Sequence, residues 1–248
     1  MTGRSRTLFN ARMSAWAITF TRPVPYDEAL RLQKALLSAR IAGRIPDTVL
    51  FLEHPSVITL GVRAPDEHVL LKPAELAKRK IALYRTSRGG DATWHGPGQL
   101  VMYPIIRLHA QEAEVHEYLR NLEEIALRTA ADFGVKAFRR LGLTGAWTCS
   151  GKLAFIGIRL KRAVTFHGLS FNVRPDLAGF AAIRPCGLSG ERVTSLKELL
   201  GAECPTMTQV RRSMARHFGE VCRRPLQFAG ARQHPPEELE RLVNRNLR

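Results

Sequence analysis

The chain has 248 residues, a formal net charge of +16 and a hydrophobic content of 45%. This length and composition are those of a globular protein with a sizeable core, which excludes a largely disordered chain. No apolar run approaches the roughly 20 residues of a membrane-spanning helix, and residues 1–14 do not have the pattern of a secretory signal peptide. We therefore expect a cytoplasmic protein with reduced thiols.

The positive charge predicts attraction to an anionic partner. Nucleic acid is one alternative, but such binders usually concentrate basic residues in a stripe with stacking aromatics. Here the basic residues are dispersed and aromatics make up 7% of the chain. The charge alone is also compatible with an ordinary solvated surface.

Four cysteines, Cys149, Cys186, Cys204 and Cys222, form no CxxC pair and have no nearby histidine at metal-ligand spacing. A zinc site is therefore not expected. In a reducing compartment each cysteine is either a small hydrophobe or a nucleophile.

The first half of the chain predicts helices and short strands in mixed order. Apolar spacing, capping residues and Pro/Gly breaks indicate their limits. In chain order we expect a basic leader (1–12), a helix (25–41), two short strands (within 48–61), a short helix (73–80) and a strand (99–108).

The second half predicts a long amphipathic helix from about Val115, ended by Gly134. After it we expect two paired strands (152–160 and 163–173) joined by a basic turn. We then expect a short helix (195–200), an amphipathic helix lined by Val210 to Val221, and a polar helix from about 236.

This order of elements favours an α+β fold with a mixed, largely antiparallel sheet and flanking helices over a doubly wound parallel sheet. No linker divides the chain, so we expect a single catalytic domain over 1–248, with its core at about 45–225 and a polar tail at about 233–248. The glycine-rich stretch 88–100 matches neither GxGxxG nor GxxxxGKS, which counts against a dinucleotide or P-loop site.

Cys186 stands between Pro185 and Gly187 on a constrained turn, so its sulfur need not be packed away. By contrast, Cys204 precedes a proline and Cys222 ends an amphipathic helix, positions with no evident chemistry. An inert thiol remains the alternative for Cys186.

A free thiol has a pKa of about 8.5 and needs a cationic or hydrogen-bonding neighbour to ionise near neutral pH. The candidate neighbours are Lys152, His95 and His167. The alternative without a catalytic role is that Lys152 is an exposed lysine at a strand end and that His95 and His167 are structural.

Four stretches, RGGDATWHGPGQL (88–100), GKLAFIGIRL (151–160), FHGLSFNV (166–173) and RPCGLSGERVTSL (184–196), resemble in order and spacing the octanoyltransferases of lipoate synthesis. The resemblance covers roughly residues 45 to 200. It implies a fold related to the catalytic domains of biotin and lipoate protein ligases. It also implies transfer of an octanoyl (lipoyl) group from acyl carrier protein to a lysine of lipoate-dependent enzymes, without a cofactor or metal.

The resemblance implies that Cys186 is the acyl-thioester nucleophile and that Lys152 lowers the pKa of its thiol. It implies acceptors in the lipoyl domains of 2-oxoacid dehydrogenase E2 subunits and in the H protein of glycine cleavage. A monomer is expected, with no nucleic-acid or membrane partner. The implied substrate-binding residues are Arg88, Gly89, Gly90, Asp91, Ala92, Thr93, Trp94, His95, Phe155, Ile156, Gly157, Gly168, Leu169 and Ser170.

Glycines allow backbone to approach a ligand, and free amides can face an oxyanion. We therefore expect Gly89, Gly90, Gly96 and Gly98 to form one wall of a narrow acyl slot. Trp94, where the family commonly has tyrosine, is expected to affect the depth of this slot. Asp91 also departs from the family, which commonly has glutamine there.

Two other functions are compatible with this fold. An ATP-dependent lipoate or biotin ligase would need an adenylate site and no nucleophilic cysteine, so Cys186 argues against it. A catalytically inactive binding protein would not need Cys186 and Lys152 together.

Overall fold

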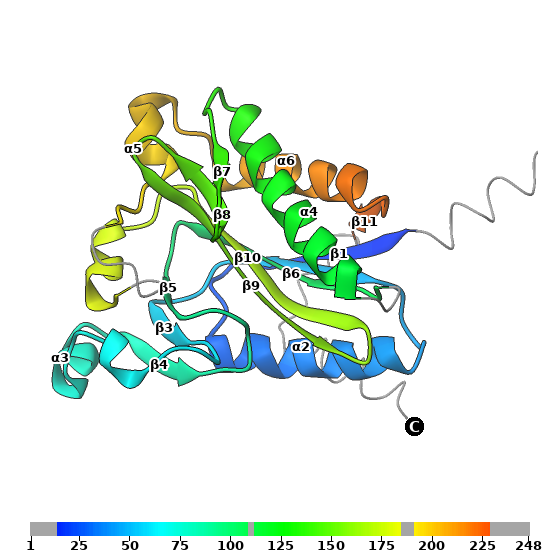
Figure 1. Cartoon of the computed structure of the whole chain (residues 1–248), viewed down its shortest axis with the longest axis horizontal. Helices are drawn as coiled ribbons and strands as arrows, with labels where there is room; N and C mark the ends of the chain where they lie inside the picture. The colour runs from blue at the N-terminus through cyan, green and yellow to red at the C-terminus, as the bar shows by residue number, and fades with distance from the viewer. Residues whose placement is uncertain (1–13, 109–111, 185–190, 229–248) are drawn as a thin grey trace, which may run out of the picture.

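The computed structural model describes residues 14–108, 112–184 and 191–228, without the side chains of 112–114. Eight strands form the main sheet in the order β11-β1-β2-β6-β10-β9-β8-β7 (Figure 1). β1 is parallel to β2 and β11, and all other neighbours are antiparallel. The strands are β1 (Ala15–Thr19), β2 (Thr48–Leu52), β6 (Gln99–Ile105), β7 (Phe138–Arg140), β8 (Leu143–Thr148), β9 (Gly151–Lys161), β10 (Val164–Asn172) and β11 (Leu226–Phe228).

Helices cover both faces of this sheet (Figure 1). On one face, α4 (Glu112–Ala131) and α6 (Met207–Val221) bury Leu122 and Phe218 against the strands. On the opposite face, α2 (Tyr26–Ile41) buries Leu32 and Leu36. Each such side chain stabilises the fold by about 1.5–3 kcal/mol when removed from water. The predicted α+β architecture is therefore confirmed.

A smaller sheet, in the order β4-β3-β5, lies beside the main one. Its strands are β3 (Val57–Leu60), β4 (Ala82–Arg85) and β5 (Ala92–His95), and α3 (Pro73–Lys78) follows β3 in the chain. Phe155 of β9 stacks on Phe180 of the 3₁₀ helix η2 (Leu177–Ala182), with ring centroids 5.1 Å apart. These rings share one buried cluster with Ile58 and Leu60 of β3, which holds the small sheet against β9.

Most predicted elements are present with small shifts. The helix predicted over 25–41 begins at Tyr26, the short helix predicted over 195–200 is α5 (Leu196–Leu200), and β9 pairs with β10 as expected. β1, β5, β7, β8 and β11 were not predicted. The leader at 1–12 and the polar helix from about 236 lie outside the described residues. No helix in the described part of the chain has the length and apolar character needed to cross a membrane.

Candidate active site

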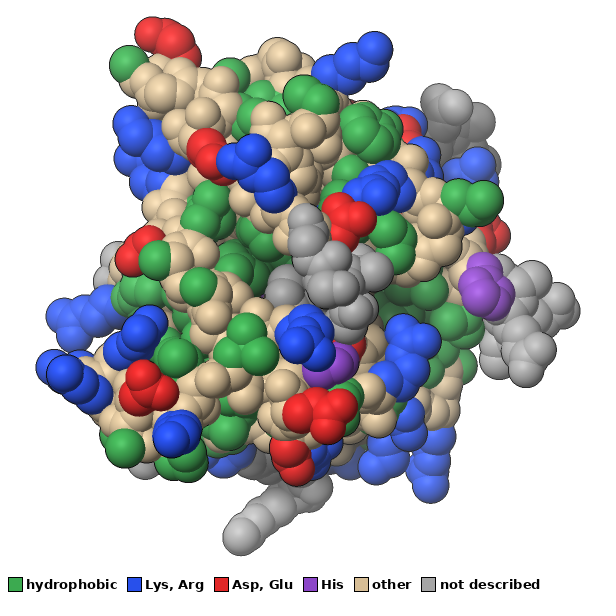
Figure 2. Space-filling model, turned by 60° about the vertical axis from the view of Figure 1, so that its left-hand side comes forward, with side chains coloured by type: hydrophobic (Ala, Val, Ile, Leu, Met, Phe, Trp, Pro, Cys, Tyr) green, Lys and Arg blue, Asp and Glu red, His purple; other side chains and the backbone are tan. Residues whose placement is uncertain are grey.

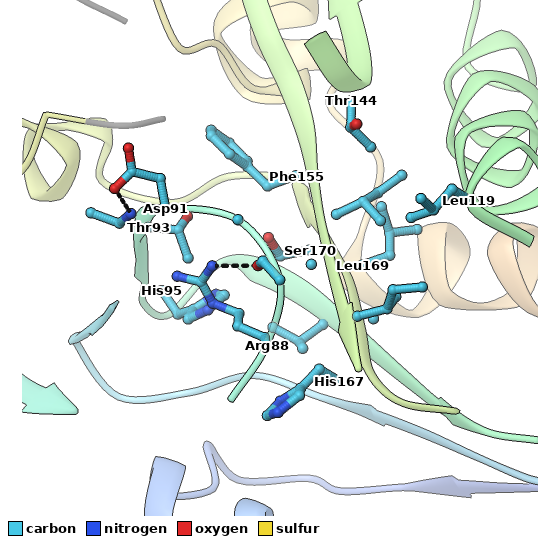
Figure 3. Close-up of a pocket in the computed structure, with 18 of the residues that line it drawn as sticks. Arg88, Asp91, Thr93, His95, Leu119, Thr144, Phe155, His167, Leu169 and Ser170 are labelled. Atoms are coloured by element: carbon cyan, nitrogen blue, oxygen red, sulfur yellow. Dashed lines mark hydrogen bonds between the residues drawn. The ribbon is translucent and has the colours of Figure 1, made fainter. Parts of the chain in front are cut away.

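A cavity of about 420 Å³ lies where β5, β6, β9 and β10 meet, with α2 and α4 contributing one residue each (Figure 3). It brings together all the expected substrate-binding residues except Trp94, and it includes Lys152 and His167. The cavity also takes in residues that the sequence did not single out, namely Tyr26, Arg63, Val101, Tyr103, Leu119, Gly142, Leu143, Thr144 and Ile158.

Trp94 does not line this cavity, which corrects the expectation for this residue. Its indole N–H donates to Ser56 Oγ at 2.9 Å, and its ring packs edge-on against Phe180 with centroids 5.2 Å apart. Trp94 therefore belongs to the core between the two sheets, and its size does not directly set the depth of the slot.

Gly96 and Gly98 are also absent from the cavity wall, contrary to expectation. A Cβ on Gly96 would lie 2.2 Å from the Trp94 ring. Gly98 has φ +87°, and a Cβ there would lie 2.5 Å from Arg174 O. The absence of a side chain at Gly96 leaves room for the Trp94 indole, and at Gly98 it allows the turn between β5 and β6. Neither glycine makes room for a ligand.

Gly89 and Gly90 do line the cavity, and bare backbone lets their loop lie directly on β9. Gly89 N donates to Ile158 O at 2.8 Å, so this amide is not free to face an oxyanion, contrary to the expectation. Across the contact, a Cβ on Gly157 would lie 2.8 Å from Gly89 O. The close approach of the Gly89 backbone to the Gly157 backbone therefore explains why a glycine is needed at position 157.

Lys152 begins the buried part of β9 and is 6% exposed. Its Nζ lies 4.8 Å from the ring centroid of Phe155 and 5.0 Å from that of Trp147. Aromatic faces attract a cation at these distances. Gly145 of β8 provides space for the lysine, since a Cβ there would lie 2.9 Å from Lys152 Cε.

Cys186 lies outside the described residues. The chain on either side of the undescribed stretch is anchored at the cavity. Before it, Arg184 N donates to His68 O at 2.9 Å, and the His68 ring pairs with cavity-lining Asp91 at 2.7 Å. After it, the main chain of Lys152 bonds to both Arg192 and Thr194, at 2.8 and 3.0 Å.

Arg88 also lines the cavity, is 8% exposed and is held by strand β3. Its guanidinium donates to Thr59 O at 2.6 Å and to Thr59 Oγ1 at 2.9 and 3.1 Å. Another nitrogen donates to Gly89 O at 3.1 Å, the contact drawn in Figure 3. These bonds hold the glycine loop against the small sheet.

Four rings, His95, His54, Tyr103 and His167, follow one another with successive centroids 5.6, 5.8 and 6.4 Å apart, and all but His54 line the cavity. Burial lowers the pKa of His54 to about 4. Burial, with a further contribution from the Arg88 charge, lowers the pKa of both His95 and His167 to about 3. All three imidazoles are therefore neutral near pH 7.

The two cavity-lining histidines lie at different ends of the site. His167 pairs with Ile158, six residues along β9 from Lys152, or about 20 Å at 3.3 Å per residue. His95 bonds through Gln99 to Asn172, whose neighbour Phe171 pairs with Ala154, close to Lys152. His95 is therefore the histidine at the Lys152 end.

His167 has an unusual backbone conformation for a strand residue, with φ +59°. The neighbouring strand carries Pro104, and a Cβ on Gly168 would lie 2.7 Å from its Cδ and 2.3 Å from Met102 O. β10 is irregular here, and the N–H of His167 donates to Gln33 Oε1 at 2.8 Å. Left-handed backbone in a non-glycine residue is costly and clusters at functional sites.

The other cysteines offer little chemistry. Burial raises the pKa of Cys222 to about 12, which agrees with an inert thiol. Cys204 is partly buried and Cys149 is exposed. Among the described residues, no group of three or more His, Cys, Asp or Glu side chains is arranged to hold a metal ion.

Residues 25–219 match the lipoyl protein ligase A/B catalytic domain. The chain is 43% identical over 212 residues to an octanoyltransferase from Chloroflexus aurantiacus, covering 84% of this chain and 95% of the relative. It is 46% identical over 202 residues to an octanoyltransferase from Gloeobacter violaceus, covering 80% and 88%.

Solved structures agree on the fold at low identity. A lipoate-protein ligase A bound with ATP gives a TM-score of 0.76 at 17% identity, over 94% of this chain and 95% of that one. A bipartite lipoate protein ligase from Thermoplasma acidophilum gives 0.73 at 17% identity, over 95% and 92%. The chain belongs to the lipoyl protein ligase A/B catalytic domain family, and within it is similar to octanoyltransferases over most of its length.

Proposed function

We propose that this protein transfers an octanoyl group from an acyl carrier protein to a lysine of a lipoyl domain, through a thioester on Cys186. The observation that carries the proposal is the buried Lys152 in the lining of a cavity with polar and apolar parts, in a chain 43% identical to an octanoyltransferase. The cavity volume of about 420 Å³ lies in the range of small-molecule sites.

The acyl chain would lie against apolar lining residues, namely Leu119, Leu143, Ile156, Ile158 and Leu169; Figure 3 labels Leu119 and Leu169. Each buried methylene contributes about 0.8 kcal/mol. An eight-carbon chain can therefore be held by burial alone, without a charged anchor.

In the first step, the Cys186 thiolate, favoured by the Lys152 ammonium, attacks the carbonyl carbon of the carrier thioester. A new carbon–sulfur bond forms, and the carrier leaves as a thiol after taking a proton from Lys152. In the second step, the acceptor amine attacks, its excess proton passes to neutral Lys152, and the Cys186 thiolate leaves. Conversion of a thioester to an amide is downhill, so no nucleotide is required.

The test is intact-mass analysis after mixing the protein with octanoyl carrier protein, without ATP. Wild type and the matched Cys149→Ala control should each gain one octanoyl group, and Cys186→Ala should gain none. Adding a lipoyl domain should remove the adduct and acylate the domain. An adduct that persists in Cys186→Ala, or transfer only when ATP and free acid are supplied, would reject the thioester mechanism.

The expected partners are acidic, namely the acyl carrier protein as donor, and E2 lipoyl domains and the glycine cleavage H protein as acceptors. The net charge of +16 supports electrostatic attraction of such acidic partners to this protein, which we expect to act as a monomer. Figure 2 shows Lys and Arg side chains spread over one face rather than gathered in a stripe, which does not favour nucleic acid. We expect kcat/KM to fall several-fold as salt rises to about 0.5 M, where charges are screened beyond a few Å.

A further inference from the structure

A continuous chain of buried hydrogen bonds connects the cavity to the strand that carries Lys152. His95 Nδ1 lies 2.6 Å from Gln99 Oε1, Gln99 Nε2 lies 2.8 Å from Asn172 Oδ1, and Asn172 Nδ2 lies 2.9 Å from Thr194 O. Gln99, Asn172 and Thr194 are fully buried, and His95 is 6% exposed. The amide of Thr194 then donates to Lys152 O.

The direction of every bond in this chain follows from its last member. Thr194 O is a backbone carbonyl and can only accept, so Asn172 must turn its NH₂ toward it. The Asn172 oxygen then faces Gln99, which must donate in turn. The Gln99 oxygen is thereby left facing His95, and the imidazole must donate from Nδ1.

His95 is therefore fixed in the tautomer that carries its proton on Nδ1, with Nε2 as the hydrogen-bond acceptor of a cavity-lining ring. The neighbouring His54 is fixed independently, because its Nδ1 lies 2.6 Å from Val24 O. The pKa of His95, lowered by burial to about 3, keeps the ring neutral at physiological pH.

We propose that Gln99 and Asn172 are positioning residues that hold His95 Nε2 as the acceptor for an N–H of the incoming lysine amine. This inference rests on the proposed acyl transfer. A neutral amine carries two N–H groups and one lone pair, so an acceptor on one N–H orients the lone pair toward the thioester carbon. His95 is too weak a base to keep the proton, which leaves that task to Lys152.

The arrangement also ties the acceptor to the reacting centre. The chain of bonds ends at Thr194, which pairs with Lys152. Movement of His95 relative to Lys152 would break at least one buried bond, and leaving a buried polar group unsatisfied is costly. Strand register brings these residues together, since Gln99 pairs directly with Asn172.

The first test is the tautomer itself, measured by long-range ¹H–¹⁵N NMR of the full chain labelled at histidine. His95 should show the Nδ1–H pattern in wild type. Asn172→Leu does not touch His95 but leaves the Gln99 amide group with only its long 3.4 Å bond to Trp94 O, so the amide can rotate more easily and the Nε2–H form should become populated. Gln99→Leu should do the same, while Gln99→Glu keeps an oxygen beside Nδ1 and should retain the wild-type pattern. His54 should be unchanged throughout.

The second test separates the two acyl-transfer steps. In Asn172→Leu and Gln99→Leu, octanoylation of Cys186 should proceed within about threefold of wild type. Transfer to the lipoyl domain should slow at least tenfold, with partial recovery in Gln99→Glu. An Nε2–H tautomer in wild-type His95, or variants that shift the tautomer and keep the wild-type transfer rate, would overturn the inference. A wild-type protein that never forms the adduct would instead refute the proposed function, and the tautomer result would still stand.

Discussion

Lys152 Nζ lies 4.8 Å from the ring centroid of Phe155, and Phe155 stacks in turn on Phe180. Lys152 is 6% exposed, and its Nζ lies against a fixed aromatic face, where an attraction of about 0.5–2 kcal/mol on a cation is typical. An aromatic face at this distance attracts a cation more strongly than a neutral amine.

Replacing Lys152 should affect the two acyl-transfer steps differently. Lys152→Arg keeps a charge that can favour the thiolate, but guanidinium does not lose its proton, so an adduct should form slowly and then persist. Lys152→Met should slow adduct formation itself by at least 100-fold. The measurement is the time course of the octanoyl adduct by intact mass. Lys161→Met, at the exposed end of the same strand, is the matched control and should behave as wild type.

Local patterns were sufficient to predict the long elements of the fold. Two apolar stretches joined by a basic turn over 152–173 predicted two paired strands, and the structure shows β9 and β10 paired from Val164 to Phe171. β5 was missed because it lies within a stretch of glycines and a histidine, whose individual preferences argue for a turn. Its strand conformation comes from pairing with β3, a tertiary contact.

Motifs predicted most residues of the candidate site, but they did not predict the buried Gln99–Asn172 pair that holds His95. Gln99 begins β6 and Asn172 ends β10, and a polar residue at the limit of an apolar strand is a weak signal for a buried polar pair. Their contact depends on the register between β6 and β10, which local sequence does not specify. Trp94 and Gly96 were wrongly assigned to the wall because adjacency to a motif does not fix the direction of a side chain.

Two glycine substitutions should have opposite effects on stability. In Gly157→Ala the new Cβ would lie 2.8 Å from Gly89 O and 3.2 Å from Arg88 Cδ, so the glycine loop must move. Overpacking of this kind costs about 1–3 kcal/mol and should also reduce transfer. Gly219→Ala, within α6, meets nothing closer than 3.5 Å and should raise the free energy of unfolding by about 0.5–1 kcal/mol. Chemical denaturation of both variants checks the signs, and a Gly157→Ala protein as stable as wild type would contradict the close backbone contact.

Thr93 and Thr59 pair across β5 and β3, and their hydroxyls have different roles. Thr93 Oγ1 is buried in the cavity lining without a hydrogen-bond partner among the described residues, whereas Thr59 Oγ1 accepts from Arg88. Thr93→Val should therefore leave stability unchanged or higher, while KM for the octanoyl donor rises several-fold. Thr59→Val should destabilise by about 1–3 kcal/mol, because it leaves a buried charge short of an acceptor. A Thr93→Val protein with unchanged KM would show that this hydroxyl does not contact substrate.

The buried histidines should make stability depend on pH between about 4.5 and 6.5. His54, His95 and His167 have folded-state pKa values of about 4, 3 and 3, against 6.5 in the unfolded chain. As the pH falls below 6.5, the unfolded chain takes up protons that the folded protein does not, so the free energy of unfolding decreases. Each histidine contributes up to about 1.4 kcal/mol per pH unit in this window.

The carboxylates with lowered pKa, Asp27, Glu124, Asp132 and Glu220, start from unfolded values of 3.8 or 4.5, so their effect on stability falls mainly below this window. Urea unfolding at pH 7.0, 6.0 and 5.0 should therefore show a steady loss of stability that reports the histidines. His167→Asn tolerates the positive φ and removes one of the three groups, so its loss of stability over this range should be about one third smaller. Equal losses in wild type and His167→Asn would mean that His167 titrates alike in the folded and unfolded protein.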